Sequence, residues 1–251
     1  MKQLIEAVIF DFGGTLFTYE PSNTQLITEV GALFGYNISP SDPRLIQAFL
    51  KQEEHLARRW AANWPDSRKD LTKEDWIQLN QALLDELGIV HPIANGVLQY
   101  KFQDRKCHYT IRPELKGILS LLKQQGIKLG IISNTNEEGA ELRRRLLVEH
   151  DLTDYFDVIL FSSECGEYKP SPEIFQTALR ILHISDPFNV VYIGDSIAID
   201  VKGAQHAGLR AVLFHPGNGI SEPVLIIHNL QDLVYLLAIE EEVKNAILSY
   251  A

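Results

Sequence analysis

The second half of the chain alternates short apolar runs with longer amphipathic segments. The apolar runs are rich in β-branched residues and cover residues 127–132, 158–161, 190–193 and 211–214. The segments between and around them, near residues 113–122, 137–149, 172–182 and 198–207, have the periodicity of helices. Strands that alternate with helices of this length form a parallel sheet with right-handed crossovers. The pattern therefore predicts an α/β fold.

A further apolar run near the start of the chain, residues 7–10, ends abruptly in Asp11. Two glycines and Thr15 follow closely, so the run is predicted to be a buried strand that delivers Asp11 to the open end of the sheet. Ligands of α/β proteins bind beyond the carboxyl ends of the strands, which makes Asp11 a candidate reactive group. On this stretch alone, a second interpretation is an Asp that merely begins a turn.

Residues 17–109 show helical periodicity and no convincing strand. Helices are expected near residues 24–33, 43–60, 72–88 and 94–109, and Thr72 with Asp75 has the spacing of a capping box. The sequence thus predicts a helical unit inserted after the first strand. Residues 1–16 and 110–251 would form the core domain and residues 17–109 the insertion, with a final helix near residues 230–250.

Charge and hydropathy exclude several classes of partner. The chain has 251 residues and a formal net charge of −10, which opposes binding to nucleic acid or to an anionic membrane, although a local basic pocket could still hold a phosphate. Every apolar run falls short of the roughly 18 residues that a membrane span needs, and the chain starts straight into a strand rather than a signal sequence. We therefore expect a cytoplasmic protein whose two cysteines, Cys107 and Cys165, are free thiols.

Three other predicted strands are also followed by polar residues. Ser133 and Asn134 follow one strand, Lys169 comes after the next, and Asp195 and Asp200 follow the third. A hydroxyl and an amide can hold an anionic oxygen, and two carboxylates about a helical turn apart can face a hard cation such as Mg²⁺. Taken singly, these residues have plainer interpretations: a helix cap, a solvated lysine, and acids that stabilise a helix N-terminus. Their occurrence in chain order at the ends of four strands favours a shared site.

In order and content these residues resemble the four motifs of the haloacid dehalogenase-like superfamily of phosphotransferases and hydrolases. Residues 11–15 match the first motif, Ser133 and Asn134 the second, Lys169 and Pro170 the third, and residues 194–195 with Asp200 the fourth. The helical insertion falls where this superfamily carries its commonest all-helical cap. The resemblance implies a Rossmann-like three-layer α/β core with a parallel sheet and an inserted helical cap domain.

The resemblance also implies catalytic and substrate-binding roles. Asp11 would attack a phosphoryl group and form an aspartyl phosphate, and Lys169 would act as the second catalytic residue. Thr15 together with Ser133 or Asn134 would position the phosphoryl oxygens. Phosphoryl transfer depends on charge neutralisation and positioning, which a cation and a lysine can supply.

A magnesium site is implied by the same resemblance. Mg²⁺ would be the cofactor, held by the Asp11 carboxylate, the backbone carbonyl of Gly13, Asp195 and, directly or through water, Asp200. These are the hard oxygen ligands that Mg²⁺ prefers.

Gly13 departs from the phosphatase pattern of the superfamily. Its phosphatases carry a second Asp two residues after the nucleophile, which protonates the leaving group and then activates water, whereas this chain has Gly13. Loss of a general acid–base costs a factor of about 10² to 10⁴ in rate. A Gly13→Asp change is expected to raise activity toward alkyl phosphates, provided that the loop accepts a Cβ.

Three functions remain open at this point. The first is a Mg²⁺-dependent phosphatase or phosphotransferase that acts on a small phosphorylated metabolite, with impaired or substrate-assisted acid–base catalysis or an acid supplied by the cap. The second is a carbon-centred hydrolase: a 2-haloacid dehalogenase, or a phosphonatase-like enzyme with a Schiff-base lysine in the cap. The third is a catalytically silent protein that binds phosphate.

Substrate choice has only weak signals in the cap. Two segments are candidates to touch the leaving group: the loop with Trp64, Arg68 and Lys69, or residues 55–60. The lysines available for a Schiff base are Lys51, Lys69, Lys73, Lys101 and Lys106, and no local motif selects one of them. The substrate and the oligomeric state stay open.

Overall fold

The computed structural model describes residues 5–62, 72–104, 108–135, 137–215 and 223–237. Its main feature is a six-stranded sheet in the order β5-β4-β1-β6-β7-β8. The strands are β1 (Ala7–Phe10), β4 (Lys128–Ser133), β5 (Val158–Phe161), β6 (Val190–Gly194), β7 (Arg210–Phe214) and β8 (Leu225–Ile227). Each neighbouring pair in this sheet is parallel, which confirms the predicted α/β class.

The first strand lies at the centre of the sheet. Phe10, its last residue, is in register with Ile131 of β4 on one side and with Ile193 of β6 on the other. Because all three strands run in the same direction, the polar residues that follow them meet at one edge. The predicted strand ends are therefore brought together as the sequence pattern requires.

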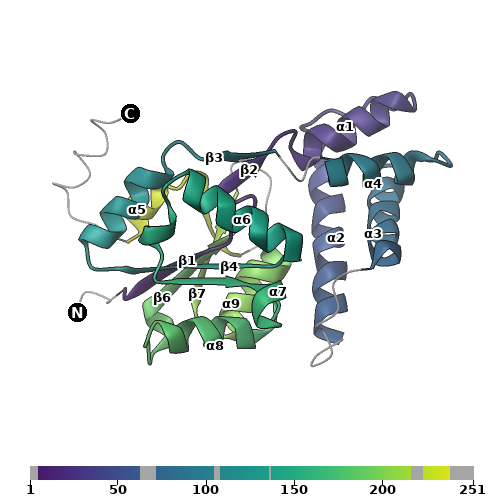
Figure 1. Ribbon diagram of the computed structural model, residues 1–251. Coiled ribbons are helices and arrows are strands. Elements are labelled where there is room, and N and C mark those ends of the chain that lie inside the picture. Colours follow the sequence, from purple (N-terminus) through teal and green to yellow (C-terminus); the bar gives the residue numbers. More distant parts are fainter. Residues whose placement is uncertain (1–4, 63–71, 105–107, 136, 216–222, 238–251) are drawn as a thin grey trace.

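Helices cover both faces of the sheet and complete the three layers (Figure 1). One face carries α5 (Leu115–Gln124), α6 (Glu137–Glu149) and α10 (Asp232–Leu236), whose apolar residues pack on Val8 and Phe10. The other carries α8 (Pro172–Ile181) and α9 (Lys202–His206), which pack on Ala7 and Ile9. Alternate residues of a strand point to opposite faces, so β1 contributes to both cores and its side chains are fully buried.

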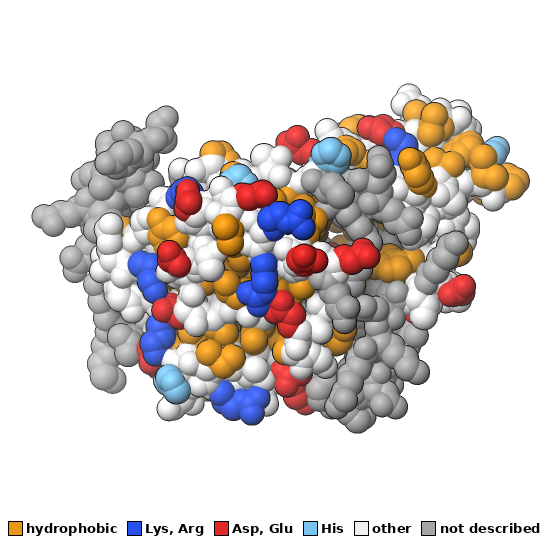
Figure 2. Space-filling model, viewed as in Figure 1, with side chains coloured by type: hydrophobic (Ala, Val, Ile, Leu, Met, Phe, Trp, Pro, Cys, Tyr) orange, Lys and Arg blue, Asp and Glu red, His pale blue; other side chains and the backbone are white. Residues whose placement is uncertain are grey.

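The insertion is a separate group of four helices beside the sheet (Figure 1). They are α1 (Asn23–Leu33), α2 (Pro43–Ala62), α3 (Lys73–Glu86) and α4 (Ala94–Asp104), and they share an apolar core of their own. The capping box predicted at Thr72 and Asp75 is present at the start of α3. In Figure 2 apolar side chains gather over α1 and α4, and Leu33, Val90 and Ile93 are among the exposed apolar residues of the insertion.

Two short strands connect the insertion to the core, where the sequence predicted none. They are β2 (Phe17–Tyr19) and β3 (Tyr109–Ile111), which pair antiparallel between the sheet and the cap helices (Figure 1). Three residues are too few to show an alternating pattern, which explains why periodicity missed them. The pair spans the predicted boundaries at residues 16–17 and 109–110, and the division into two domains stays a prediction.

Other differences from the sequence prediction are small. Strand β8 and the short helix α7 (Ser162–Cys165) were not predicted from the sequence. The helix expected from residue 198 starts as a π-helix, Ile197–Val201, and continues as α9. Only α10 of the final predicted helix falls within the described residues. Within that part of the chain, every helix is too short or too polar to cross a membrane.

Candidate active site

The ends of the central strands bring the predicted nucleophile and lysine into contact. Asp11 follows β1, and its Oδ1 atom accepts hydrogen bonds from Lys169 Nζ at 2.6 Å and from the Ser133 hydroxyl at 3.3 Å. Asp11, Ser133 and Lys169 are all buried, although 122 residues separate Asp11 from Ser133 and 158 separate it from Lys169. The parallel pairing of β1 with β4, and of β4 with β5, brings these residues to one end of the sheet.

Lys169 is the centre of a buried polar cluster. Its ammonium group also donates to Asp200 Oδ1 at 2.7 Å and to the Tyr192 hydroxyl at 2.9 Å. The Tyr192 hydroxyl in turn donates to the same Asp200 oxygen at 2.9 Å. Burial alone would lower the pKa of Lys169, but Asp11 and Asp200 raise it above its usual value. Lys169 is therefore held as a cation between two carboxylates.

Asn134 binds the backbone of the lysine segment. Its Nδ2 donates to the Lys169 carbonyl at 2.8 Å, and its Oδ1 accepts from the Lys169 backbone N–H at 2.9 Å. Both ends of the amide are therefore used to place Lys169. The sequence predicted a substrate contact for Ser133 or Asn134, and the geometry gives Asn134 a positioning contact.

Asp195 completes a group of three carboxylates. Oxygen atoms of Asp11, Asp195 and Asp200 all lie within 4.8 Å of one another. Asp11 and Asp200 are buried and form ion pairs with Lys169, whereas Asp195 is exposed and forms no ion pair within the described residues. Although Asp195 is exposed as a residue, the protein atoms around its carboxylate desolvate it. This desolvation, and then the charges of Asp11 and Asp200, raise the pKa of Asp195 well above its usual range.

This donor set fits a hard divalent cation. The candidate ligands are carboxylate oxygens and, at Gly13, a backbone carbonyl, which are the groups that bind Mg²⁺. Three carboxylates close together around one lysine leave an excess of negative charge, which a cation would neutralise. Two glycines beside these acids leave no room for a side chain. A Cβ at Gly14, in the loop after β1, would overlap the Asp195 carboxylate, and a Cβ at Gly194, at the end of β6, would overlap the Asp200 carboxylate.

Thr15 provides an unused donor beside these acids. The residue is fully buried, and among the described residues its hydroxyl has no hydrogen-bond partner. A buried hydroxyl without a partner costs free energy, so Thr15 has a free donor that a ligand oxygen can accept. This agrees with the predicted phosphoryl-binding role of Thr15.

The space beside Gly13 is filled by Tyr19. The Gly13 backbone does not have a positive φ, so its conformation does not require glycine. A Cβ there would nevertheless overlap the Tyr19 hydroxyl and lie 2.9 Å from the ring carbon Cζ. The expected rescue by Gly13→Asp is therefore corrected: the loop accepts a Cβ only if Tyr19 moves.

Arg112 holds the nucleophile loop and was not predicted from the sequence. It directly follows β3, and its guanidinium group donates to the carbonyls of Thr15 at 2.6 Å and Gly14 at 2.7 Å. The same group stacks on the ring of Phe214, 4.2 Å from the centroid. An isolated arginine after a three-residue strand carries no sequence signal for this contact.

Tyr192 was also missed, although it carries a signal. It is the one tyrosine in the aliphatic run of β6, and a buried tyrosine hydroxyl normally has a partner. Here the hydroxyl accepts from Lys169 and has two acceptors within reach, Asp200 Oδ1 and the Ile132 carbonyl at 3.2 Å.

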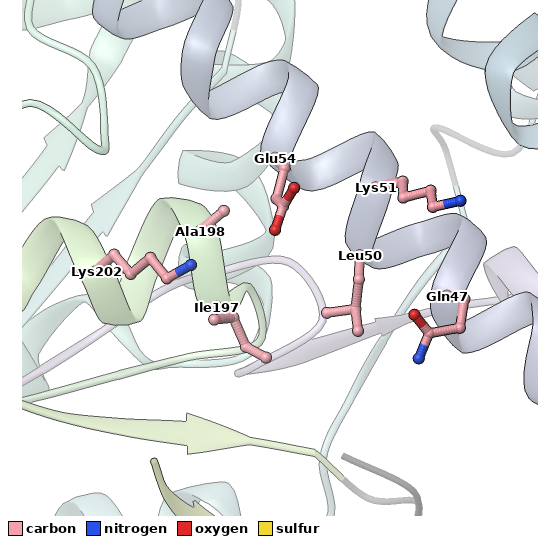
Figure 3. A pocket seen from close by; sticks show the side chains of 7 residues that line it. All are labelled: Gln47, Leu50, Lys51, Glu54, Ile197, Ala198 and Lys202. Atoms are coloured by element: carbon pink, nitrogen blue, oxygen red, sulfur yellow. The ribbon is translucent and has the colours of Figure 1, made fainter. Parts of the chain in front are cut away.

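The cap reaches the core through α2. The Ser196 hydroxyl, next to Asp195, donates to Glu53 Oε2 at 2.9 Å. Burial raises the pKa of Glu53 to about 7, and Asp200 adds to the rise, while Ser196 opposes it. A cavity of about 220 Å³ lies between α2 and the π-helix. In Figure 3, Leu50 and Glu54 of α2 point toward Ile197 and Ala198 of the π-helix.

The predicted cap contacts with substrate are only partly described. Trp64, Arg68, Lys69 and Lys106 lie outside the described residues, as does Cys107, and the side chain of Lys73 is not described either. Lys51 and Lys101 form ion pairs with Glu86 and Glu29, both at 2.6 Å. Cys165 is a free thiol, as predicted.

Known proteins with similar sequences are hydrolases. The family model of haloacid dehalogenase-like hydrolases matches residues 5–208. A phosphoglycolate phosphatase of Neisseria meningitidis is 41% identical over 210 residues, which cover 83% of this chain and 79% of that protein. A ribulose-1,5-bisphosphate 5-phosphatase of Halopiger xanaduensis is 28% identical over 84% of each chain. A phosphoserine phosphatase of Thermus thermophilus is 31% identical over 56% of this chain and only 54% of its own length.

Solved structures show the same fold. A dehalogenase determined with an intermediate complex has a TM-score of 0.64 at 22% identity, covering 96% of this chain and all of that one. A Bacillus subtilis hydrolase of the same superfamily, bound to magnesium, has a TM-score of 0.61 at 21% identity, covering 94% of this chain and all of that one. The family match, the parallel sheet and the convergence of the four motifs lead to one conclusion: the chain belongs to the haloacid dehalogenase-like hydrolases.

Proposed function

We propose that this protein is a Mg²⁺-dependent phosphatase that hydrolyses a small phosphorylated metabolite through an aspartyl phosphate on Asp11. The observation that carries the proposal is the Lys169 ammonium group, held 2.6 Å from Asp11 and 2.7 Å from Asp200 beside the third carboxylate, Asp195. The phosphatase names of the three relatives support this choice within the family.

The nucleophile is positioned by its neighbours. Among the described residues, the hydrogen bonds that the Asp11 carboxylate accepts both run to Oδ1, from Lys169 and Ser133. Its other oxygen, Oδ2, is therefore the atom that can approach phosphorus. A carboxylate attacks phosphorus without prior deprotonation, so positioning and charge neutralisation are the main requirements.

The phosphoryl group is stabilised by the surrounding donors. Thr15 would donate its unpartnered hydroxyl to a phosphoryl oxygen, and Lys169 would neutralise developing charge. Asp11, the Gly13 carbonyl, Asp195 and Asp200 would hold Mg²⁺, which supplies further charge neutralisation when bound.

Gly13 affects the second step of the reaction in particular, which is the hydrolysis of the aspartyl phosphate. With no carboxylate at position 13 to activate water, hydrolysis of the aspartyl phosphate is expected to be slowed at least as much as its formation. The covalent intermediate should therefore accumulate.

Rapid-quench kinetics with an activated aryl phosphate test this function. We expect an initial burst of the phenol product, phosphate attached to Asp11, and loss of both in EDTA. The Asp11→Asn variant is the control and should show neither. Linear product formation without a phosphorylated protein would contradict the proposal, and chelator-resistant halide release from 2-haloacids would indicate dehalogenation instead.

The substrate itself can then be found by direct assay. A screen of phosphorylated metabolites, run with Mg²⁺ and with EDTA, should give activity only in the first condition. Inertness toward every substrate, together with no burst, would favour the catalytically silent phosphate-binding protein.

A further inference from the structure

The Tyr19 hydroxyl occupies the place of a missing side chain. A Cβ at Gly13 would overlap that hydroxyl, and the ring carbon that bears the hydroxyl is 2.9 Å from the Cβ position. Position 13 lies two residues after Asp11, and the backbone carbonyl of Gly13 itself is a candidate metal ligand. A side chain that starts at this Cβ would begin where the phenol oxygen now lies.

Tyr19 is fixed in this place by the strands that join core and cap. It is half-buried in β2 and pairs with Tyr109 of β3, and the two rings lie 5.0 Å apart. Arg143 of α6, only 8% exposed, lies within electrostatic range of both tyrosines and of Asp11. The phenol is thus held at the site by the pairing of β2 with β3.

The hydroxyl remains a donor at ordinary pH. An unperturbed tyrosine has a pKa of about 10, so its hydroxyl keeps its proton near neutral pH. A phenol that keeps its proton can donate a hydrogen bond to an oxygen that gains negative charge.

We propose that Tyr19 is a catalytic residue that takes the place of the absent acid by donating a hydrogen bond to the leaving-group oxygen. This inference rests on the proposed phosphatase function. As the bond between Asp11 and phosphorus forms, the bond from phosphorus to the ester oxygen breaks and the electron pair stays on that oxygen. Tyr19 stabilises the alkoxide without ionising, and the alkoxide then takes a proton from water. The hydroxide left behind is consumed when the aspartyl phosphate is hydrolysed.

This role makes the effect of Tyr19 depend on the leaving group. An alkoxide is a strong base and gains much from a hydrogen bond, whereas a nitrophenolate carries a delocalised charge and gains little. If Tyr19 merely filled space, replacing it would slow the reaction of both substrates equally.

The first test compares Tyr19→Phe with the wild type on an alkyl and on a 4-nitrophenyl phosphate. We expect formation of the aspartyl phosphate from the alkyl ester to fall by about 10²-fold, as for the loss of one donor to a developing oxyanion, and formation from the aryl ester to fall much less. Tyr155→Phe is the matched control, because it removes a hydroxyl that contacts Ser120 at 2.9 Å, outside the site. Equal losses on both esters, or no loss on either, would overturn the inference.

A binding measurement separates this inference from the proposed function. Beryllium fluoride with Mg²⁺ mimics a phosphoryl group on a carboxylate but contains no leaving group. The wild type and Tyr19→Phe should bind it with similar affinity by calorimetry. If the wild type fails to bind it and also shows no burst, the phosphatase proposal fails. If Tyr19→Phe alone loses binding, Tyr19 holds the loop rather than the leaving group.

A double substitution tests the steric part of the argument. Gly13→Asp alone should lose activity, because its side chain meets Tyr19. Tyr19→Val puts a β-branched residue, which suits a strand, at this position of β2 and clears the space, so Gly13→Asp combined with Tyr19→Val should exceed both single variants on alkyl phosphates. Activity of Gly13→Asp alone above the wild type would show that Tyr19 does not occupy the acid position.

Discussion

Two sides of the molecule meet at Asp11, and they are built differently. The core side consists of strand ends: Asp11 and Asp195 each follow a strand of one parallel sheet, and Ser133 is the last residue of another. The other side consists of residues from the insertion and its connections, Tyr19 from β2 and Glu53 from α2. In the proposed function, the core side would supply attack and charge neutralisation, whereas the insertion side would adapt the site to a leaving group.

The comparison shows where change is tolerated. Core residues depend on one another through a buried ion-pair cluster, so losing any of them disturbs the rest. Residues of the insertion side reach the site from separate elements, Tyr19 from β2 and Glu53 from α2. We therefore expect substitutions on the core side to have larger effects than those on the insertion side.

Lys169→Met should have the largest effect. It leaves the buried Asp11 and Asp200 carboxylates without their cation, and breaking a buried ion pair in this way costs about 3–5 kcal/mol of unfolding free energy. Urea denaturation in EDTA measures this loss, and phosphoryl transfer should be abolished as well.

Lys123→Met is the matched control for that loss. Lys123 forms an ion pair with Asp157 at 3.0 Å, where both side chains are 36% exposed, and an exposed pair is worth less than about 1 kcal/mol. Similar losses in the two variants would show that the Lys169 cluster is not a distinct stabilising feature of the core side.

Asp195→Asn should separate metal binding from stability. The substitution removes one of three crowded carboxylates, so the metal-free protein should unfold at a higher temperature than the wild type. Mg²⁺ affinity should fall at least about 10-fold, because a ligand is lost. Thermal unfolding with EDTA and with a Mg²⁺ titration gives both values. A metal-free midpoint below that of the wild type would contradict the charge-crowding explanation.

The same contrast explains what could be read from the sequence. The strand-end residues were predictable, because apolar runs mark where strands end and a parallel register brings those ends to one edge. Asp11 and Lys169 were found in this way despite the 158 residues between them. Their hydrogen-bond partners were less predictable: the two bonds from Asn134 to the Lys169 backbone follow from the loop geometry alone.

The insertion side could not be predicted by the same reasoning. Tyr19 lies in a three-residue strand whose partner is almost a hundred residues away, and Glu53 lies on a helix whose docking on Ser196 is a tertiary contact. Arg112 contacts Thr15 across 97 residues of sequence. No local sequence pattern predicts such contacts, because they depend on how the cap packs against the core.

Arg112→Lys should have an intermediate effect. A lysine cannot reproduce the two guanidinium hydrogen bonds to the Gly14 and Thr15 carbonyls or the stacking on Phe214. We expect a loss of about 1–3 kcal/mol in unfolding free energy, together with weaker Mg²⁺ binding, because the loop carries the Gly13 carbonyl.

Arg44→Lys is the control for this change, since Arg44 is exposed in the cap and pairs with Asp42 next to it. A loss at Arg112 no larger than that at Arg44 would mean that the nucleophile loop keeps its shape without the arginine. Such a result would weaken the case that residues adjoining the insertion shape the core.

Glu53→Gln should have the smallest effect, and it should depend on pH. Burial raises the pKa of Glu53 to about 7 in the folded protein, against about 4.3 for an unperturbed glutamate. Between these values the folded chain keeps a proton that the unfolded chain has released, so Glu53 lowers stability as the pH rises through this window.

Glutamine cannot ionise, and the thermal midpoint of Glu53→Gln minus that of the wild type should therefore increase from about pH 4.5 to about pH 7 and then level off. The measurement is made in EDTA, so that metal binding does not contribute to the difference. Glu54→Gln, whose partner Arg58 is exposed, should show no such increase. A difference for Glu53→Gln that stays flat across this range would mean that the cap does not hold Glu53 against the core in solution, and that the insertion side of the site is open there.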